Sequence, residues 1–215
     1  QARHKILQAG LFDPIVDAIA TYLGPEPETI LDVGCGEGTP LARLLALRDG
    51  QDTAIGFDIS KDGINLATQQ PVDAFFCVAD LARLPFNDHT ISTIIDLFSP
   101  SAYDEFNRVA KTGGRLIKII PNSDYLHELR VALFGTGQKN SSYSNDKVFD
   151  LFMTHYPSAS IDKLTYEFSI PKGMQQDLLT MTPLHWGKGR QDNALQLVNA
   201  LKTITVDVSV MVADF

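Results

Sequence analysis

Short apolar runs alternate with amphipathic segments along the first half of the chain. The runs are rich in β-branched or aromatic residues and lie between turn residues, which is typical of buried strands. The predicted strands are 29–32, 53–58, 74–78, 91–95 and 115–120. Residues 61–69 and 103–109, and the segment after Thr39, have the apolar spacing and capping residues of helices. This alternation predicts an α/β fold with an open, mostly parallel sheet covered by helices on both faces.

The pattern is looser outside this alternating region. Residues 2–23 are predicted to be helical, with an interruption at Asp13–Pro14. Beyond residue 121 we expect a polar loop over 135–145, a strand over 163–170 and a half-exposed closing strand over 203–212, where apolar and polar residues alternate. Further helices are predicted over 125–134, 147–156, 174–181 and 193–201.

Composition and charge narrow the class of protein. With 44% apolar and 20% charged residues in 215, we expect a helical segment (residues 1–27) followed by one domain (residues 28–215). No apolar run approaches the ~20 residues that span a bilayer, so no membrane contact is expected. The two cysteines favour a reduced, cytoplasmic location. The net charge of −8 argues against broad non-specific nucleic-acid binding but allows a local basic patch.

The segment that ends the first predicted strand carries the candidate chemistry. Asp32 is followed by glycines at alternate positions, and Thr39 (as N-cap) with Pro40 then suits the start of a helix. These glycines are Gly34, Gly36 and Gly38. Glycine is needed where the backbone takes a positive φ or where a ligand approaches it with no Cβ between. The segment therefore predicts a nucleotide or nucleoside site, although such turns also occur in α/β domains without a ligand.

Acidic residues near the ends of three predicted strands indicate the kind of cofactor. Asp58 lies twenty residues after the last glycine, a spacing at which a carboxylate accepts hydrogen bonds from ribose hydroxyls. Asp32, directly before the turn, and Glu37, inside it, would repel a pyrophosphate, so they favour a phosphate-free cofactor with a positive end. S-adenosylmethionine, with a sulfonium, an ammonium group and an adenosine, fits this description. Asp80, with the Leu81 backbone beside it, is the candidate acceptor for the adenine amino group, and its alternative role is a turn cap.

The turn and its flanking acids resemble motif I and its partners in class I S-adenosylmethionine-dependent methyltransferases, over about residues 28–121. Further segments, spread over nearly the whole chain, resemble the 23S rRNA (guanine-N1)-methyltransferase family. The more specific ones are an early Ala-Gly-x-aromatic segment and a late Met-Thr-Pro segment followed by a tryptophan. The matching segments are Gln8–Pro14, Leu31–Gly38, Phe76–Ala79, Leu84–Phe86, Arg108–Gly114, and Leu179–Pro183 with Trp186.

This resemblance implies a Rossmann-like, mostly parallel seven-stranded sheet with an antiparallel closing strand, which is the class I methyltransferase fold. It implies cofactor contacts at Phe12, at Gly36 and Glu37 in the turn, and at Tyr125, where some members have a histidine. Together with the residues found above, the predicted cofactor-binding set is Phe12, Asp32, Gly34, Gly36, Glu37, Gly38, Asp58, Ile59, Asp80, Leu81 and Tyr125.

The resemblance also implies an acceptor. The family methylates guanine N1, so the expected partner is 23S rRNA or its precursor. In this fold class the end of the fourth strand faces the methyl group, which makes Asp96, Ser99 and Pro100 the candidate catalytic residues. Asp96 has an alternative role as a strand-end turn acid. Residues 134–160 and 173–192 are expected to be insertions on the substrate side.

Candidate bases and RNA contacts come later in the chain. His155 and His185 are candidate bases for the guanine N1 proton, and each has the alternative of a surface or packing role. Trp186, with His185, Lys188 and Arg190, is a candidate patch for base stacking and phosphate contact. The alternative for this patch is a core tryptophan followed by a solvated basic turn.

Three functions are open at this point. The first is guanine-N1 methylation of rRNA, the second is methylation of a small molecule, and the third is non-catalytic binding of S-adenosylmethionine. Family members carry a four-cysteine zinc module ahead of the region compared, and Cys35 and Cys77 are too few for a tetrahedral site, so no metal is expected. A homodimer is also considered, and the sequence does not decide between one copy and two.

Overall fold

The computed structural model describes residues 1–136, 144–186 and 189–215. The strands are β1 (Thr29–Val33), β2 (Thr53–Asp58), β3 (Phe75–Val78), β4 (Ile91–Leu97), β5 (Ala110–Pro121), β6 (Ser160–Ser169) and β7 (Thr203–Asp214). The helices are α1 (Ala2–Gln8), α2 (Asp13–Thr21), α3 (Thr39–Leu47), α4 (Lys61–Ala67), α5 (Tyr103–Val109), α6 (His127–Phe134), α7 (Asp146–His155), α8 (Gln175–Met181), α9 (Ala194–Ala200) and the 3-10 helix η2 (Pro183–Trp186). The alternation predicted over the first half of the chain is confirmed.

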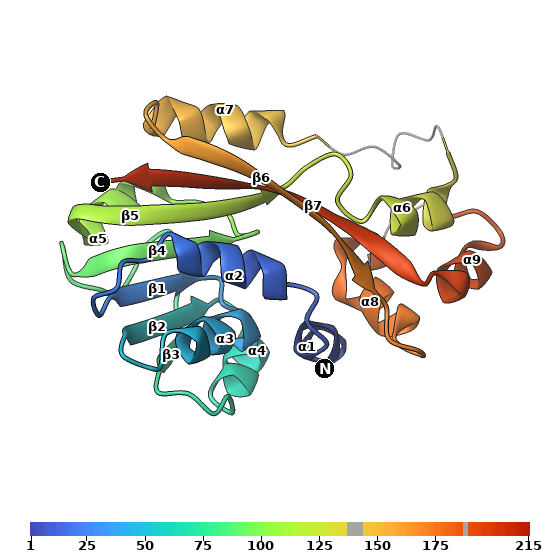
Figure 1. Cartoon of the computed structure of the whole chain (residues 1–215), viewed down its shortest axis with the longest axis horizontal. Helices are drawn as coiled ribbons and strands as arrows, with labels where there is room; N and C mark the ends of the chain where they lie inside the picture. The colour runs from blue at the N-terminus through green and yellow to red at the C-terminus, as the bar shows by residue number, and fades with distance from the viewer. Residues whose placement is uncertain (137–143, 187–188) are drawn as a thin grey trace. The chain divides into compact units, whose positions relative to one another are not determined.

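The strands form one seven-stranded sheet with the order β3-β2-β1-β4-β5-β7-β6 (Figure 1). β1 pairs in parallel with β2 and β4, and β2–β3 and β4–β5 are also parallel. The carboxyl ends of these five strands therefore lie at one edge of the sheet. The strand order reverses between β1 and β4, and ligands of open α/β sheets bind beside such a reversal, at the carboxyl ends of the strands.

The last strand of the chain, β7, is antiparallel to β5, as predicted. Gly114 pairs with Phe215 at one end, and Asn122 pairs with Asp207 at the other. However, β7 is buried over most of its length, so the expectation of half exposure is wrong. Consecutive residues Val210–Ala213 are all buried, and because the side chains of a strand point alternately to its two faces, both faces are covered there.

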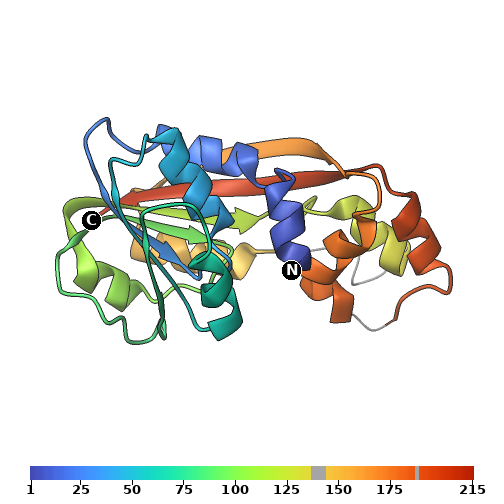
Figure 2. The same ribbon diagram turned by 90° about the horizontal axis from the view of Figure 1, so that it is seen from below.

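The described residues cluster into two compact units. The strand-rich unit consists of Phe12–Ile120, Asp150–Asp162 and Val210–Phe215. The helical unit consists of Gln1–Leu11, Pro121–Phe149 and Lys163–Ser209. In the strand-rich unit, α2 and α3 lie together on one face of the sheet and α5 lies on the other, so the expected helical cover on both faces is present (Figure 2). The division into residues 1–27 and 28–215 stays a prediction.

The N-terminal helical region is interrupted, but not where the sequence suggested. The predicted break at Asp13–Pro14 is wrong, because these residues begin α2. Proline suits the first turn of a helix, where its missing N–H has no intrahelical partner. The interruption lies instead between α1 and α2 and includes Gly10, at φ +92°. Of the loop predicted over 135–145, residues 137–143 lie outside the described part of the chain.

An ion pair on α5 fastens the segment that follows β3. The Glu105 carboxylate accepts a hydrogen bond from the Leu84 amide at 2.6 Å and pairs with the Arg108 guanidinium at 2.7 Å. Arg108 in turn donates to the carbonyl oxygens of Leu84 and Phe86. The hydrogen bond from Arg108, opposed in part by desolvation, lowers the pKa of Glu105 from 4.5 to about 2. The folded state therefore favours the charged carboxylate.

We expect Glu105→Gln to lower the stability of the protein at pH 7. The stability of the variant should also change less than that of the wild type as the pH falls. A carboxyl with a lowered pKa stabilises the fold above its unfolded pKa and loses this effect as the pH falls through its folded pKa. The stability difference between wild type and variant should therefore shrink as the pH falls from about 4.5 to about 2. Urea unfolding at several pH values measures it, and a difference that stays constant with pH would contradict the assignment.

Candidate active site

The turn between β1 and α3 has the backbone conformation that its glycines predict. Gly34, Gly36 and Gly38 have φ values of +65°, +58° and +82°, which residues with a Cβ rarely adopt. The helix cap differs from the prediction by one residue. Gly38 is the N-cap, and Thr39 and Pro40 are the first two residues of α3.

Two of these glycines are required by the protein itself. A Cβ on Gly34 would lie 2.2 Å from the Ser99 hydroxyl oxygen, and a Cβ on Gly38 would lie 3.1 Å from the Ala67 Cβ. The Ser99 hydroxyl also donates to the Val33 carbonyl at 2.9 Å. The sequence interpretation explained the glycines by the approach of a ligand. For Gly34 and Gly38, close packing against the segment after β4 and against α4 is sufficient.

Asp58 connects the end of β2 to the glycine turn. One carboxylate oxygen accepts a hydrogen bond from the Gly36 amide at 2.9 Å, and the other accepts one from the Ser60 amide at 2.8 Å. The side chain is half-buried, and each oxygen has a further lone pair. Ile59, the next residue, is an exposed apolar side chain. Asp58 therefore organises the turn and can still accept a ligand hydroxyl.

Glu37 is buried beneath the turn, at 3% exposure. Its carboxylate accepts hydrogen bonds from the Thr39 amide at 3.2 Å and the Thr39 hydroxyl at 2.7 Å. The Gln70 side-chain amide donates to the Glu37 carbonyl at 3.0 Å and lies 3.3 Å from its carboxylate. A carboxylate at a helix N-terminus is stabilised by the helix dipole. Glu37 thus anchors the turn to α3, and Gln70 is a supporting residue that the sequence interpretation missed.

The remaining acids lie near the carboxyl ends of neighbouring strands. Asp32 is buried in β1, in register with Gly56 of β2 and Ile95 of β4. Asp80 follows β3, is exposed, and accepts a hydrogen bond from the Ala82 amide at 2.9 Å, which is the geometry of the alternative turn cap. Leu81, which lies between Asp80 and Ala82 in the sequence, is half-buried.

These acidic residues suit a cationic, phosphate-free cofactor. Burial raises the pKa of the Cys35 thiol, and the charges of Asp32 and Asp58 raise it further. The turn thus has a negative potential, which would repel a pyrophosphate and attract a sulfonium or an ammonium group. The residues present therefore fit S-adenosylmethionine.

Two aromatic residues meet beside this turn. Phe12 is buried, and its ring lies 5.4 Å from the ring of Phe98, at an interplanar angle of 67°. Phe98, directly after β4, has a φ of +61°, a left-handed conformation that is uncommon for a bulky residue. Tyr125 belongs to the helical unit, where the Arg130 guanidinium donates to its carbonyl. The cofactor contacts of Phe12 and Tyr125 stay predictions.

The candidate catalytic residues lie at the end of β4, but Asp96 does not face solvent. Its side chain is fully buried and is paired with Lys118 at 2.8 Å. Asp96 also accepts hydrogen bonds from the Ser99 amide at 3.1 Å and the Ser101 hydroxyl at 2.7 Å. Burial raises the pKa of Asp96, and Lys118 and the two serines oppose the rise. This is the geometry of the alternative, an acid that holds the turn after the strand, whereas Pro100 is exposed.

Lys118 is a further residue that the sequence interpretation missed. It was counted within an apolar strand, and a lysine in such a run was the available signal that a buried charge needs a partner. Of the candidate bases, His155 is exposed, and its ring lies 4.2 Å from that of Tyr103. The structure does not describe the side chain of His185.

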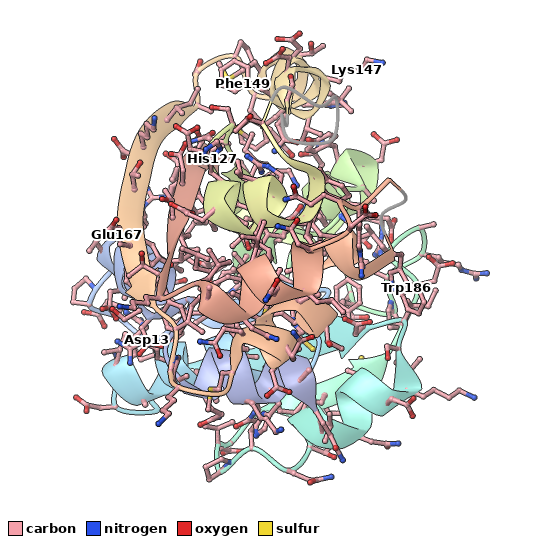
Figure 3. All side chains as sticks on the ribbon, turned by 90° about the vertical axis from the view of Figure 1, so that its right-hand side faces the viewer. Asp13, His127, Lys147, Phe149, Glu167 and Trp186 are labelled. Carbon is pink, nitrogen blue, oxygen red and sulfur yellow. The ribbon has the colours of Figure 1, made fainter. Side chains whose placement is uncertain are left out.

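Trp186 is 82% exposed, so the alternative of a core tryptophan is wrong. In Figure 3 its side chain projects from the surface of the helical unit. Arg190, four residues later, is half-buried, and its guanidinium donates to the Leu184 carbonyl at 3.3 Å. Lys188, the other predicted member of this patch, lies outside the described residues.

Two absences concern residues 1–136, 144–186 and 189–215. None of the helices there has the length and apolar character that are needed to span a bilayer. No group of three or more potential metal ligands was found among the same residues.

Comparison with known proteins agrees with the geometry. Residues 30–114 match the family model described as a methyltransferase domain. A Bacillus subtilis (strain 168) protein named "Putative 23S rRNA (guanine-N(1)-)-methyltransferase YxjB" is 38% identical, over 99% of this chain and 78% of its own. The 23S rRNA (guanine(748)-N(1))-methyltransferase of Streptomyces fradiae is 22% identical, over 97% of this chain and 76% of its own.

Solved structures show the same fold. An S-adenosylmethionine-dependent methyltransferase from Aquifex aeolicus matches 91% of this chain and 88% of its own, with a TM-score of 0.53 and 16% identity. Its likeness concerns the fold alone, whereas the Bacillus subtilis relative resembles the sequence through both compact units. The chain is therefore an S-adenosylmethionine-dependent methyltransferase and belongs to the family of the 23S rRNA (guanine-N1)-methyltransferases.

Proposed function

We propose that this methyltransferase methylates N1 of a guanine in 23S rRNA or its precursor. The observation that carries the proposal is the extent of the sequence likeness. It covers 99% of the chain, whereas the general methyltransferase model covers residues 30–114. The likeness therefore includes the helical unit, which lies outside the cofactor-binding turn and is available for recognition of the acceptor.

The cofactor residues act by binding and orientation. S-adenosylmethionine supplies an electrophilic methyl group on its sulfonium. We assign Asp58 to the ribose hydroxyls, Asp80 and the Leu81 backbone to the adenine amino group, and the exposed Ile59 side chain to the adenine ring. The buried carboxylate of Asp32 supplies negative potential for the cationic end of the cofactor.

The acceptor residues act by positioning and by excluding water, because methyl transfer is an in-line displacement. Ser99 and Pro100 border the acceptor base on the β4 side of the turn. A guanine reaches such a site only when it is unpaired or flipped out of a helix. Residues 134–160 and 173–192 are assigned to the RNA side, and the exposed Trp186 lies in the second of these segments.

We expect Trp186→Ala to weaken RNA binding by about tenfold, because stacking of a base on an aromatic ring contributes roughly 1–3 kcal/mol. Binding of S-adenosylmethionine should be unchanged. Filter binding with a single-stranded rRNA fragment and calorimetry with the cofactor measure the two affinities. Trp186→Phe, which keeps an aromatic ring, should retain most of the RNA affinity, and Leu195→Ala is the control for an exposed apolar residue of the same unit. An unchanged RNA affinity of Trp186→Ala would show that Trp186 does not belong to the RNA-binding surface of the protein.

The function itself is tested by primer extension on 23S rRNA from a strain that lacks this enzyme. Incubation of that RNA with the protein and S-adenosylmethionine should create a reverse-transcription stop at one guanine, because N1 methylation blocks base pairing. The stop should be absent when the cofactor is omitted. The proposal fails if no stop appears, and methylation of small acceptors alone would support the small-molecule function instead.

A further inference from the structure

A buried ion pair lies beneath the segment that follows β4. Lys118 of β5 is 2% exposed and Asp96 of β4 is fully buried, and the two are register partners in adjacent parallel strands. Burying two charges costs free energy that a pair of apolar side chains would not cost. Joining the two strands does not by itself explain why a charged pair lies here. The other contacts of the pair indicate its role.

Those contacts all go to Ser99 and Ser101. The Lys118 ammonium donates to the Ser99 carbonyl at 2.9 Å, and Asp96 accepts from the Ser99 amide and the Ser101 hydroxyl. Both backbone polar groups of Ser99 are thus bound by the pair. The preceding residue, Phe98, is in the left-handed conformation, which persists only when the surroundings fix it. The ion pair contributes to that fixation by binding the backbone of the next residue, together with the hydrogen bond from the Phe98 amide to the Ile119 carbonyl.

The same segment contacts the cofactor turn. The Ser99 hydroxyl donates to the Val33 carbonyl and occupies the space beside Gly34. β1 and β4 are the strands between which the sheet order reverses, so a ligand at the carboxyl edge lies between the glycine turn and this segment. A continuous series of contacts therefore runs from Lys118, through Ser99, to the first glycine of the turn.

We propose that Lys118 is a positioning residue for methyl transfer. Through Asp96 and the backbone of Ser99, it holds residues Phe98–Ser101 at a fixed distance from the glycine turn, so that acceptor and methyl donor meet in line. Lys118 is too deeply buried to contact either substrate. The proposal rests on the proposed function only for the identity of the acceptor.

The test uses a double variant, Asp96→Asn with Lys118→Met. A single substitution, of Lys118 or of Asp96, leaves the other charge buried and unpaired, which risks unfolding. The double variant removes both charges and keeps the side-chain volumes similar. We expect the double variant to fold and to bind S-adenosylmethionine within about twofold of wild type. Its kcat on 23S rRNA should fall at least about tenfold with little change in KM, because orientation and not binding is lost.

Hydrogen exchange gives a readout without RNA. The amides of residues 97–99, 101 and 102 should exchange at least about tenfold faster in the double variant, because their fixation is lost. Thr93→Val is the matched control, since it alters a buried polar residue of β4 at the end away from the segment, and both kcat and exchange should stay as in wild type.

Three outcomes separate the proposals. A double variant with wild-type kcat, or with wild-type exchange of the amides of residues 97–99, 101 and 102, would overturn the role of Lys118. A loss of cofactor affinity as large as the loss of kcat would also overturn it, because the defect would then lie in the turn. If wild type does not methylate 23S rRNA, the proposed function fails, and the exchange measurement still tests Lys118.

Discussion

Gly34→Ala is expected to lower the rate of methyl transfer at least about 100-fold and to weaken binding of S-adenosylmethionine strongly. The new Cβ would lie 2.2 Å from the Ser99 hydroxyl oxygen, so the turn or the segment after β4 must move. The φ of +65° adds backbone strain for any residue other than glycine. A displacement of about 1 Å at a reacting site can reduce a rate about 100-fold. Calorimetry with the cofactor and single-turnover methylation of rRNA measure the two effects.

Gly50→Ala is the matched control for this substitution. Gly50 has the same φ of +65°, but a Cβ there has no neighbour within 4 Å. It should therefore report the cost of the backbone conformation alone, which lowers stability slightly and leaves activity unchanged. Gly34→Ala combined with Ser99→Gly removes the overlap and should recover part of the cofactor binding. Equal behaviour of Gly34→Ala and Gly50→Ala would refute the steric explanation.

Arg48→Ala is expected to lower the free energy of unfolding by about 3–5 kcal/mol, because it leaves a buried carboxylate without its partner. The Arg48 and Asp52 side chains are 8% and 0% exposed, and the guanidinium contacts both carboxylate oxygens, at 2.6 and 2.8 Å. Arg48 also donates to the carbonyls of Gly24 and Glu26, so it fastens the linker that precedes β1. Urea unfolding measures the loss.

Arg43→Ala is the control, because Arg43 lies in α3 and Arg48 is the C-cap residue of that helix. Arg43 pairs with Asp13 and Asp17, whose side chains are 39% and 53% exposed, and exposed pairs contribute about 0–1 kcal/mol. The combined variant Arg48→Ala and Asp52→Ala should be less destabilised than Arg48→Ala alone, because no unpaired charge stays buried. A loss below about 1 kcal/mol in Arg48→Ala would show that the pair is not a buried anchor.

The glycine turn was predictable from sequence because its causes are local. A β-branched run, three alternating glycines and a proline in the first turn of α3 determine strand, turn and helix within a dozen residues. The supports of the turn were not predictable in the same way. Gln70 and Lys118 reach Glu37 and Asp96 through the tertiary structure, and the periodicity of a strand or helix does not indicate which distant residue will lie beside it.

The burial of β7 was mispredicted for a related reason. Alternating polar residues suggested one face in solvent, yet Asp207 is buried. Its carboxylate accepts hydrogen bonds from the Asn122 side-chain amide at 3.1 Å and from the Thr165 hydroxyl at 2.9 Å. Polar residues that pair with neighbouring strands have the same sequence pattern as polar residues in water. At Trp186 the sequence left both a buried and an exposed side chain open, and the side chain is exposed.

The hydrogen bonds of Asp58 hold its side chain in place before any ligand arrives. Because the Gly36 and Ser60 amides already bind both carboxylate oxygens, these hydrogen bonds restrict the rotamers of the side chain in the free protein. Immobilising a free side chain on binding costs roughly 0.5–1.5 kcal/mol, and here that entropy is lost on folding instead. The carboxylate of Asp58 is thus preorganised for the ribose hydroxyls that we assign to it. The affinity for these hydroxyls therefore depends on the backbone positions of Gly36 and Ser60 as much as on the carboxylate itself.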